Sequence, residues 1–98
     1  MIDPVRTFGA LNNPLRWKMM KVMADGTMLS ATDAAKAFGR DIDGVIKHLR
    51  ILRDAGLVST QYGEQDRRFI LYYIPQASRP QPGVLDFGFC VLYLSRRS

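Results

Sequence analysis

The segment RDIDGVIKHLRILRDAGLV, residues 40–58, has the pattern of an amphipathic helix that carries both cationic and acidic side chains. Its apolar residues recur at the three- and four-residue spacing of one helix face. They are Ile42, Val45, Ile46, Leu49 and Leu52. Asp41 stands where an N-cap is expected, and Gly56 ends the pattern. The sequence therefore predicts a helix from Asp41 to Ala55.

The face opposite this apolar stripe is mixed in charge. At about 100° per residue, Asp43, Lys47, Arg50 and Asp54 cluster on it. In one interpretation, Lys47 and Arg50 bind phosphates or guanine edges of DNA. In the alternative, the face is an ordinary solvated surface on which Asp43 pairs with Lys47, and Arg50 with Asp54, four residues apart.

Two carboxylates at the front of this helix need an explanation if its partner is a polyanion. An Asp41 N-cap accepts a backbone N–H and favours the helix dipole, which together are worth about 1 kcal/mol. Asp43 also suits the dipole, but in a major groove it would approach phosphates and fit only opposite a cytosine amino group. We therefore expect modest affinity for DNA, narrow sequence preference, or both.

Three more helices are predicted before this segment. Asp-Pro at 3–4 and Asn-Pro at 13–14 are N-cap and first-turn pairs, and they open helices over 4–11 and 14–25, the second ended by Gly26. The helix over 14–25 has an apolar arc wider than one buried stripe requires, which indicates that it is covered on two sides.

The third helix, over 31–38, makes a helix-turn-helix with residues 41–55. Ser30 followed by Asp33 resembles a capping box at its start, and Gly39 ends it. Only two or three residues then separate it from the next helix, which is the connection expected of this motif.

Two β-rich runs follow, over 57–62 and 68–74, and the residues Gly-Glu-Gln-Asp between them predict a hairpin. Helix, turn, helix and hairpin is the winged-helix order. Arg67 and Arg68 follow the hairpin tip, where they are candidates for phosphate contact, as is Arg40 at the turn before the fourth helix. The alternative is a solvated turn, because Glu64 and Asp66 lie beside them.

The remaining residues are predicted to form a connector, a strand and a tail. Residues 75–83 are proline-rich and irregular, residues 84–94 form a strand buried on both sides, and SRRS is a solvated end. The fold class is thus mainly α with small β: a winged helix-turn-helix with four helices, a β-hairpin wing and a C-terminal strand. We expect one domain over 1–98, with its core over 1–74 and the strand and tail over 84–98.

Composition excludes several classes of function. The 98 residues carry 14 Lys and Arg against 9 Asp and Glu, a net charge of +5 that favours polyanion partners. One cysteine and one histidine predict no internal disulfide, no metal site and no cofactor. No apolar run is long enough to span a membrane and no signal peptide is visible, so we expect a cytoplasmic protein. The sequence shows neither a nucleophile placed with a base nor a pair of carboxylates, so nothing in it indicates an enzyme.

Three stretches carry a resemblance to a known family: ALNNPLRWKMMKVM at 10–23, HLRILRDAGLVS at 48–59 and FILYYI at 69–74. Over roughly residues 8–74 the chain resembles the ArsR-type winged-helix transcription regulators. The resemblance implies a dimer, with the helix 41–55 in the major groove of double-stranded DNA and the hairpin tip on the flanking backbone.

The chain departs from that family at two places. The family's recognition helix commonly starts with small polar residues such as Ser, Gln and Thr, whereas the matching positions here hold Ile42, Asp43, Gly44 and Ile46. Its metal-binding cysteines are absent from LSATDAAKAFG at 29–39. His48 matches a histidine common in the family, for which we expect a structural or phosphate-contacting role, and Cys90 is expected to be a small buried hydrophobe.

A homodimer is expected because the helix over 14–25 and the strand over 84–94 both need more cover than one small domain supplies. The predicted interface residues are Val5, Phe8, Trp17, Met20, Phe87, Phe89 and Val91. The favoured function is a DNA-binding transcriptional regulator, most simply a repressor, that uses the helix 41–55 and the wing 57–74. The alternative is a protein-interaction module that docks a partner at Ile42, Gly44 and Ile46. The sequence identifies no small-molecule effector.

Overall fold

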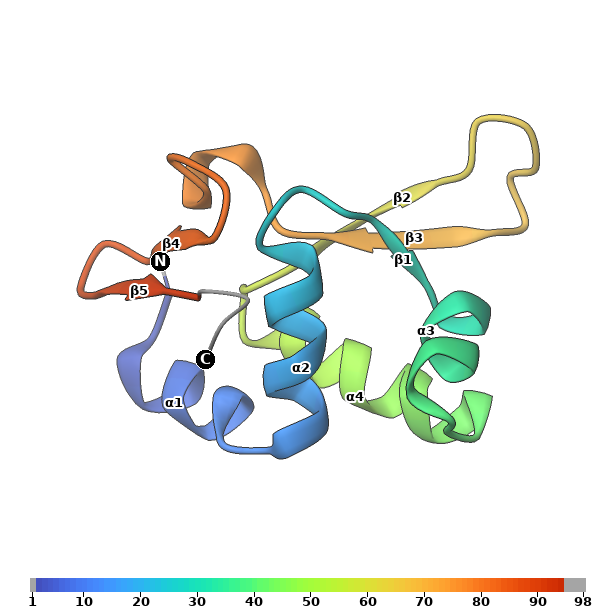
Figure 1. The fold of residues 1–98 in the computed structure, drawn as a ribbon, viewed down its shortest axis with the longest axis horizontal. Coiled ribbons are helices and arrows are strands. Elements are labelled where there is room, and N and C mark those ends of the chain that lie inside the picture. The colour runs from blue at the N-terminus through green and yellow to red at the C-terminus, as the bar shows by residue number, and fades with distance from the viewer. Residues whose placement is uncertain (1, 95–98) are drawn as a thin grey trace.

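The computed structural model describes residues 2–94, which form a winged helix (Figure 1). Its helices are α1 (Pro4–Leu11), α2 (Pro14–Met23), α3 (Ala31–Phe38) and α4 (Ile42–Asp54). Its strands are β1 (Leu29–Ser30), β2 (Ser59–Tyr62), β3 (Ile70–Tyr73), β4 (Val84–Asp86) and β5 (Val91–Tyr93), and a 3-10 turn, η1 (Gln76–Ser78), precedes β4. The β2–β3 hairpin projects from one side of the helices, and β4–β5 lies on the opposite side, beside α1 (Figure 1).

Side-chain caps start all four helices where the sequence predicts them. Asp3 accepts the Val5 N–H at 3.1 Å, and Asn13 accepts those of Leu15 and Arg16 at 2.9 and 3.0 Å. Ser30 accepts from Asp33 at 3.0 Å, and Asp41 from Gly44 at 3.2 Å. The first turns of these helices are therefore set by local hydrogen bonds.

The helix ends agree less closely with the sequence. Gly39 is the left-handed C-cap of α3, with φ of 63°. The second helix ends at Met23, two residues before the predicted Asp25, and Gly26 adopts its φ of 101° two positions beyond the C-cap Ala24. The turn that stops α2 is thus longer than a single-glycine cap.

The wing is a three-stranded antiparallel sheet in the order β1-β3-β2. Its register pairs Ser59 with Tyr73 and Tyr62 with Ile70, so the predicted hairpin is confirmed. The loop between the strands covers residues 63–69 and not four residues, because the Asp66 carbonyl accepts the Phe69 N–H at 3.1 Å and makes a second turn. The two-residue strand β1 is too short to show a periodic pattern.

One core lies under the helices and the wing. Val45, Leu49 and Leu52 of α4 are fully buried. The core also holds the α2 methionines and residues from the wing and the β4 region: Met19, Met20, Met23, Leu57, Ile74 and Leu85. The wide apolar arc of α2 is therefore covered in large part within this chain.

The predicted single strand over 84–94 is wrong, because β4 and β5 form an antiparallel hairpin that pairs Val84 with Tyr93. Gly88 makes the turn with φ of 90°, and the Asp86 carboxylate accepts its N–H at 2.9 Å. Nor is the segment buried on both sides, since Val91 is 44% and Tyr93 75% exposed. The predicted tail, residues 95–98, lies outside the described residues.

None of the helices in residues 2–94 is long and apolar enough to cross a membrane.

Candidate nucleic-acid interface

Two cations on the outward face of α4, Lys47 and Arg50, form no ion pair with a carboxylate in the described part of the chain. Because Val45, Leu49 and Leu52 are buried, Lys47 and Arg50 on the other side are exposed. Within residues 2–94, Asp43 forms no ion pair with Lys47 and Arg50 forms none with Asp54, so the predicted intrahelical pairs are absent. Asp54 pairs instead with Arg53, at 3.2 Å.

The two arginines of the wing, Arg67 and Arg68, have different partners. Asp66 accepts hydrogen bonds from the Arg68 guanidinium at 3.1 and 2.9 Å and from the Arg68 N–H at 3.0 Å. Two hydrogen-bond contributions from Arg68 lower the pKa of the Asp66 carboxyl: the larger comes from its side chain and the smaller from its backbone N–H. Arg67 has no such partner in the described chain, and its guanidinium lies over the Tyr62 ring, 5.6 Å from the centroid. Arg67 is thus the more available cation.

Arg50 of α4 and Arg68 of the wing are brought together although 18 positions separate them in the sequence. Both line a hollow of about 200 Å³, which the first turn of α3 closes with Ala31 and Thr32. Lys47, Arg40, Arg67 and Asp43 are exposed but do not line this hollow. The hollow therefore joins the fourth helix, the wing and the third helix in one surface.

A contact that the sequence did not predict fixes α4 against the first two helices. Arg16 of α2 places Nη1 2.9 Å from Nδ1 of His48 on α4. Its Nε donates to the Ala10 carbonyl at 2.6 Å, at the end of α1. His48 thus has a structural contact, and the 32 positions between it and Arg16 explain why periodicity alone does not reveal the pair.

The chemistry of this contact requires neutral His48. The Arg16 guanidinium can only donate, so Nδ1 accepts and the ring proton lies on Nε2. Burial lowers the pKa of His48 below its usual value of 6.5, and the charges of Arg16 and Arg40 lower it further. Protonation of His48 would place a second positive charge beside the Arg16 guanidinium.

The predicted dimer residues divide into two groups. Val5 is 80%, Phe8 55%, Phe89 39% and Val91 44% exposed, and we name these four residues the apolar patch. The Phe8 and Phe89 rings meet edge to face at 5.7 Å, which joins α1 to the β4–β5 hairpin.

The other predicted interface residues lie deeper. Met20 is fully buried and Phe87 is 6% exposed, so the prediction that they contact a partner is corrected: both pack in the core of this chain. Trp17 is half-buried against the same core.

Among residues 2–94, no three His, Cys, Asp or Glu side chains gather in a way that could hold a metal ion. Cys90 is a free, half-buried thiol.

Comparison with known protein families identifies the core of this chain. Residues 11–74 match the family described as HVO_A0114. The chain belongs to the HVO_A0114 family. The matched range runs from the end of α1 to the end of the wing, and it includes the α4 and wing residues that line the hollow described above. No curated protein matches this HVO_A0114 sequence.

Solved structures share the fold of this HVO_A0114 member. Reduced HlyU from Vibrio cholerae N16961 has a TM-score of 0.62 and 24% identity, over 71% of this chain and 70% of HlyU. A transcriptional regulator homologue protein from Pyrococcus horikoshii OT3 has a TM-score of 0.63 and 22% identity, over 74% and 72%. A mutant of Lactococcus lactis ZitR has 0.63 and 16%, over 69% and 46%. This likeness confirms the winged-helix fold.

We predict that the stability of the protein falls in mildly acidic solution because of His48. Its pKa is lower in the folded than in the unfolded chain, so the unfolded chain binds a proton first as the pH falls below 6.5. The free energy of unfolding should therefore drop between about pH 7.5 and about pH 5, and His48→Gln should reduce that drop. Urea denaturation at both pH values measures the effect. Identical pH dependence in both proteins would contradict it.

Proposed function

We propose that the protein is an ArsR-type transcriptional regulator that binds double-stranded DNA through α4 and the wing. The observation that carries the proposal is the joint surface on which Arg50 and Arg68 flank the first turn of α3. A buried stripe on α4 turns Lys47 and Arg50 outward together, as a helix that enters a major groove requires. Repression by occupation of a promoter is the simplest form of this function.

Each cation has a distinct role in this proposal. Arg50 is the bidentate donor to a guanine edge or a phosphate, and Lys47, one turn before it, contacts phosphate as a point charge. Arg40 and Arg67 reach the backbone that flanks the groove. Arg68 must exchange the Asp66 carboxylate for a phosphate, so its net contribution to affinity is smaller.

The proposal includes a second copy of the chain, joined through the apolar patch. Four large apolar side chains left exposed on α1 and the β4–β5 hairpin lose their contact with water in such a dimer. A twofold pair would present two α4 helices to two half-sites of DNA.

A specific observation also favours a protein-interaction module as the second candidate. Ile42, at the start of α4, is 42% exposed beside the unpaired Asp43, which is unusual on a surface that faces phosphates. Partner binding by this surface would depend little on salt, whereas DNA binding would depend on it steeply.

We predict that binding to a fluorescent duplex weakens steeply with salt and that the arginines contribute unequally to the slope. Arg50→Ala and Arg67→Ala should each reduce the slope of log K against log salt by about one, because each removes one phosphate contact. Arg68→Ala should reduce it by clearly less, because Asp66 already neutralises that side chain. Fluorescence anisotropy across a salt series measures the slopes.

Arg6→Ala is the matched control for this series, since Arg6 is exposed on α1 and lies beside Ile51 and Asp54 at the far end of α4, not at the hollow that Arg50 and Arg68 line. It should leave the slope unchanged. A flat slope in the unmodified protein would end the DNA-binding proposal.

Replacement of Asp43 tests whether the front of α4 enters the groove. Asp43→Ser removes a carboxylate that approaches phosphates and should strengthen binding about threefold to tenfold at moderate salt. Asp3→Asn makes the same change of charge at the N-cap of α1 and should have little effect. Equal effects of the two substitutions would place Asp43 outside the contact.

The apolar patch gives a prediction about assembly. Phe8→Arg should raise the dimer dissociation constant at least about tenfold, since it puts a charge into the apolar patch and removes the ring that contacts Phe89. Val22→Arg, at a 37% exposed position of α2, is the control and should leave it unchanged. Sedimentation equilibrium measures both. An unmodified protein that stays monomeric at about 100 μM would contradict a dimer of useful affinity.

A further inference from the structure

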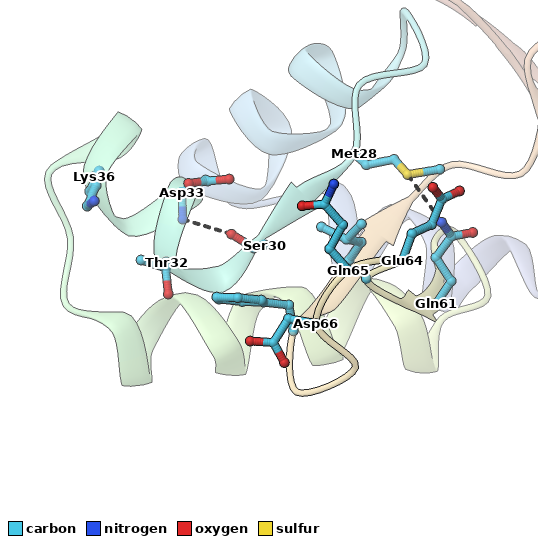
Figure 2. A pocket seen from close by; sticks show the side chains of 12 residues that line it. Met28, Ser30, Thr32, Asp33, Lys36, Gln61, Glu64, Gln65 and Asp66 are labelled. Atoms are coloured by element: carbon cyan, nitrogen blue, oxygen red, sulfur yellow. Dashed lines mark hydrogen bonds between the residues drawn. The ribbon is translucent and has the colours of Figure 1, made fainter.

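A second, larger groove lies between α3 and the wing, next to the hollow that the DNA-binding proposal uses (Figure 2). Its volume is about 770 Å³, in the range of small-molecule sites. Met28, Phe69 and Leu71 supply its apolar wall, and Met28 and Phe69 are 42% and 51% exposed. A surface of this kind gains free energy when an apolar body covers it.

The charge of this groove is opposite to that of the whole chain. Asp33 on α3 and Glu64 in the wing loop stand on its two sides (Figure 2). Neither forms an ion pair in the described chain. The third carboxylate, Asp66, is held by Arg68, and Lys36 is the one cation that lines the groove among the described residues. The groove is therefore acidic in a chain of net charge +5.

From these two properties we propose that the groove binds a small organic cation with an aromatic or otherwise bulky apolar body. The body would cover Met28 and Phe69, and the positive charge would lie between Asp33 and Glu64. The Phe69 ring adds a cation–π contact. A bare metal ion would leave the apolar wall uncovered, and an anion would meet two unpaired carboxylates, so neither matches the groove as well.

Occupancy of the groove would be linked to DNA contact, and this step rests on the proposed function. Ser30, Thr32 and Phe69 line both the groove and the hollow that holds Arg50 and Arg68. A ligand that fixes the wing against α3 thus acts on the walls of the DNA-binding surface. Any change that it makes in DNA affinity must be matched by an equal effect of DNA on ligand affinity.

The test compares two probes of the same shape and opposite charge on the full chain in the absence of DNA. Tetraphenylphosphonium should bind saturably and shift the amide resonances of residues 28–36 and 61–71 in a nitrogen-15 NMR titration. Tetraphenylborate should not shift them, although the net charge of the protein would attract it. Because no DNA is present, this result is independent of the salt-slope measurement.

Substitutions locate the charge requirement. Asp33→Asn and Glu64→Gln should each weaken tetraphenylphosphonium binding about threefold to fivefold, and the double variant about tenfold. Asp3→Asn removes a carboxylate outside the groove, at the N-cap of α1, and should leave binding unchanged. Glu64 lies in an exposed loop, so Glu64→Gln tests the proposal even if Asp33→Asn disturbs the start of α3.

Three results would overturn the proposal: equal binding of the two probes, no binding of tetraphenylphosphonium, or binding insensitive to both substitutions. A capped Ser-Arg-Arg-Ser peptide, with the sequence of residues 95–98, is titrated in parallel. If the peptide shifts the groove resonances and tetraphenylphosphonium does not, the occupant is a basic peptide segment and the organic cation is rejected.

Discussion

Burial of one side of α4 is the constraint on which the rest of the structure depends. Val45, Leu49 and Leu52 are fully buried, and removing such side chains from water contributes about 1.5–3 kcal/mol each. A rotation of the helix would expose them, so the orientation of Lys47 and Arg50 toward solvent is a consequence of core packing. The Arg16–His48 contact adds a second restraint, since it ties the same helix to α1 and α2.

The wing separates two surfaces of opposite charge. Toward α4 it offers Arg68, with Arg67 exposed beside it, and toward α3 it offers Glu64 and Asp66. The Asp66–Arg68 ion pair lies between these surfaces, because Asp66 lines the groove while Arg68 lines the hollow. A ligand in one surface and DNA on the other would both act on this pair. Glu64 and Asp66, the acidic residues beside the wing arginines, therefore line the groove and do not line the hollow that Arg50 and Arg68 share.

Short-range sequence patterns predict most of the helices and strands. Contacts between residues far apart in the sequence could not be predicted. Caps such as Asp41 act within three residues, so the helix starts were predictable. The single strand predicted over residues 84–94 is wrong because their composition is that of a buried strand, whereas Gly88 and the Asp86 carboxylate form a turn that reverses the chain. Arg50, which the sequence predicts to contact DNA, is exposed as expected. Its position near Arg68 depends on how the wing packs against α3. The groove could not be predicted, because α3 and the wing, which line it, are far apart in the sequence.

Selection of bound duplexes from a random DNA pool at two salt concentrations tests the central claim most directly. If the outward cations of α4 and the wing read DNA, the pool should become enriched in a preferred sequence arranged as an inverted repeat, and recovery should fall steeply at the higher salt. A pool that remains random at both concentrations, with recovery independent of salt, would contradict the account.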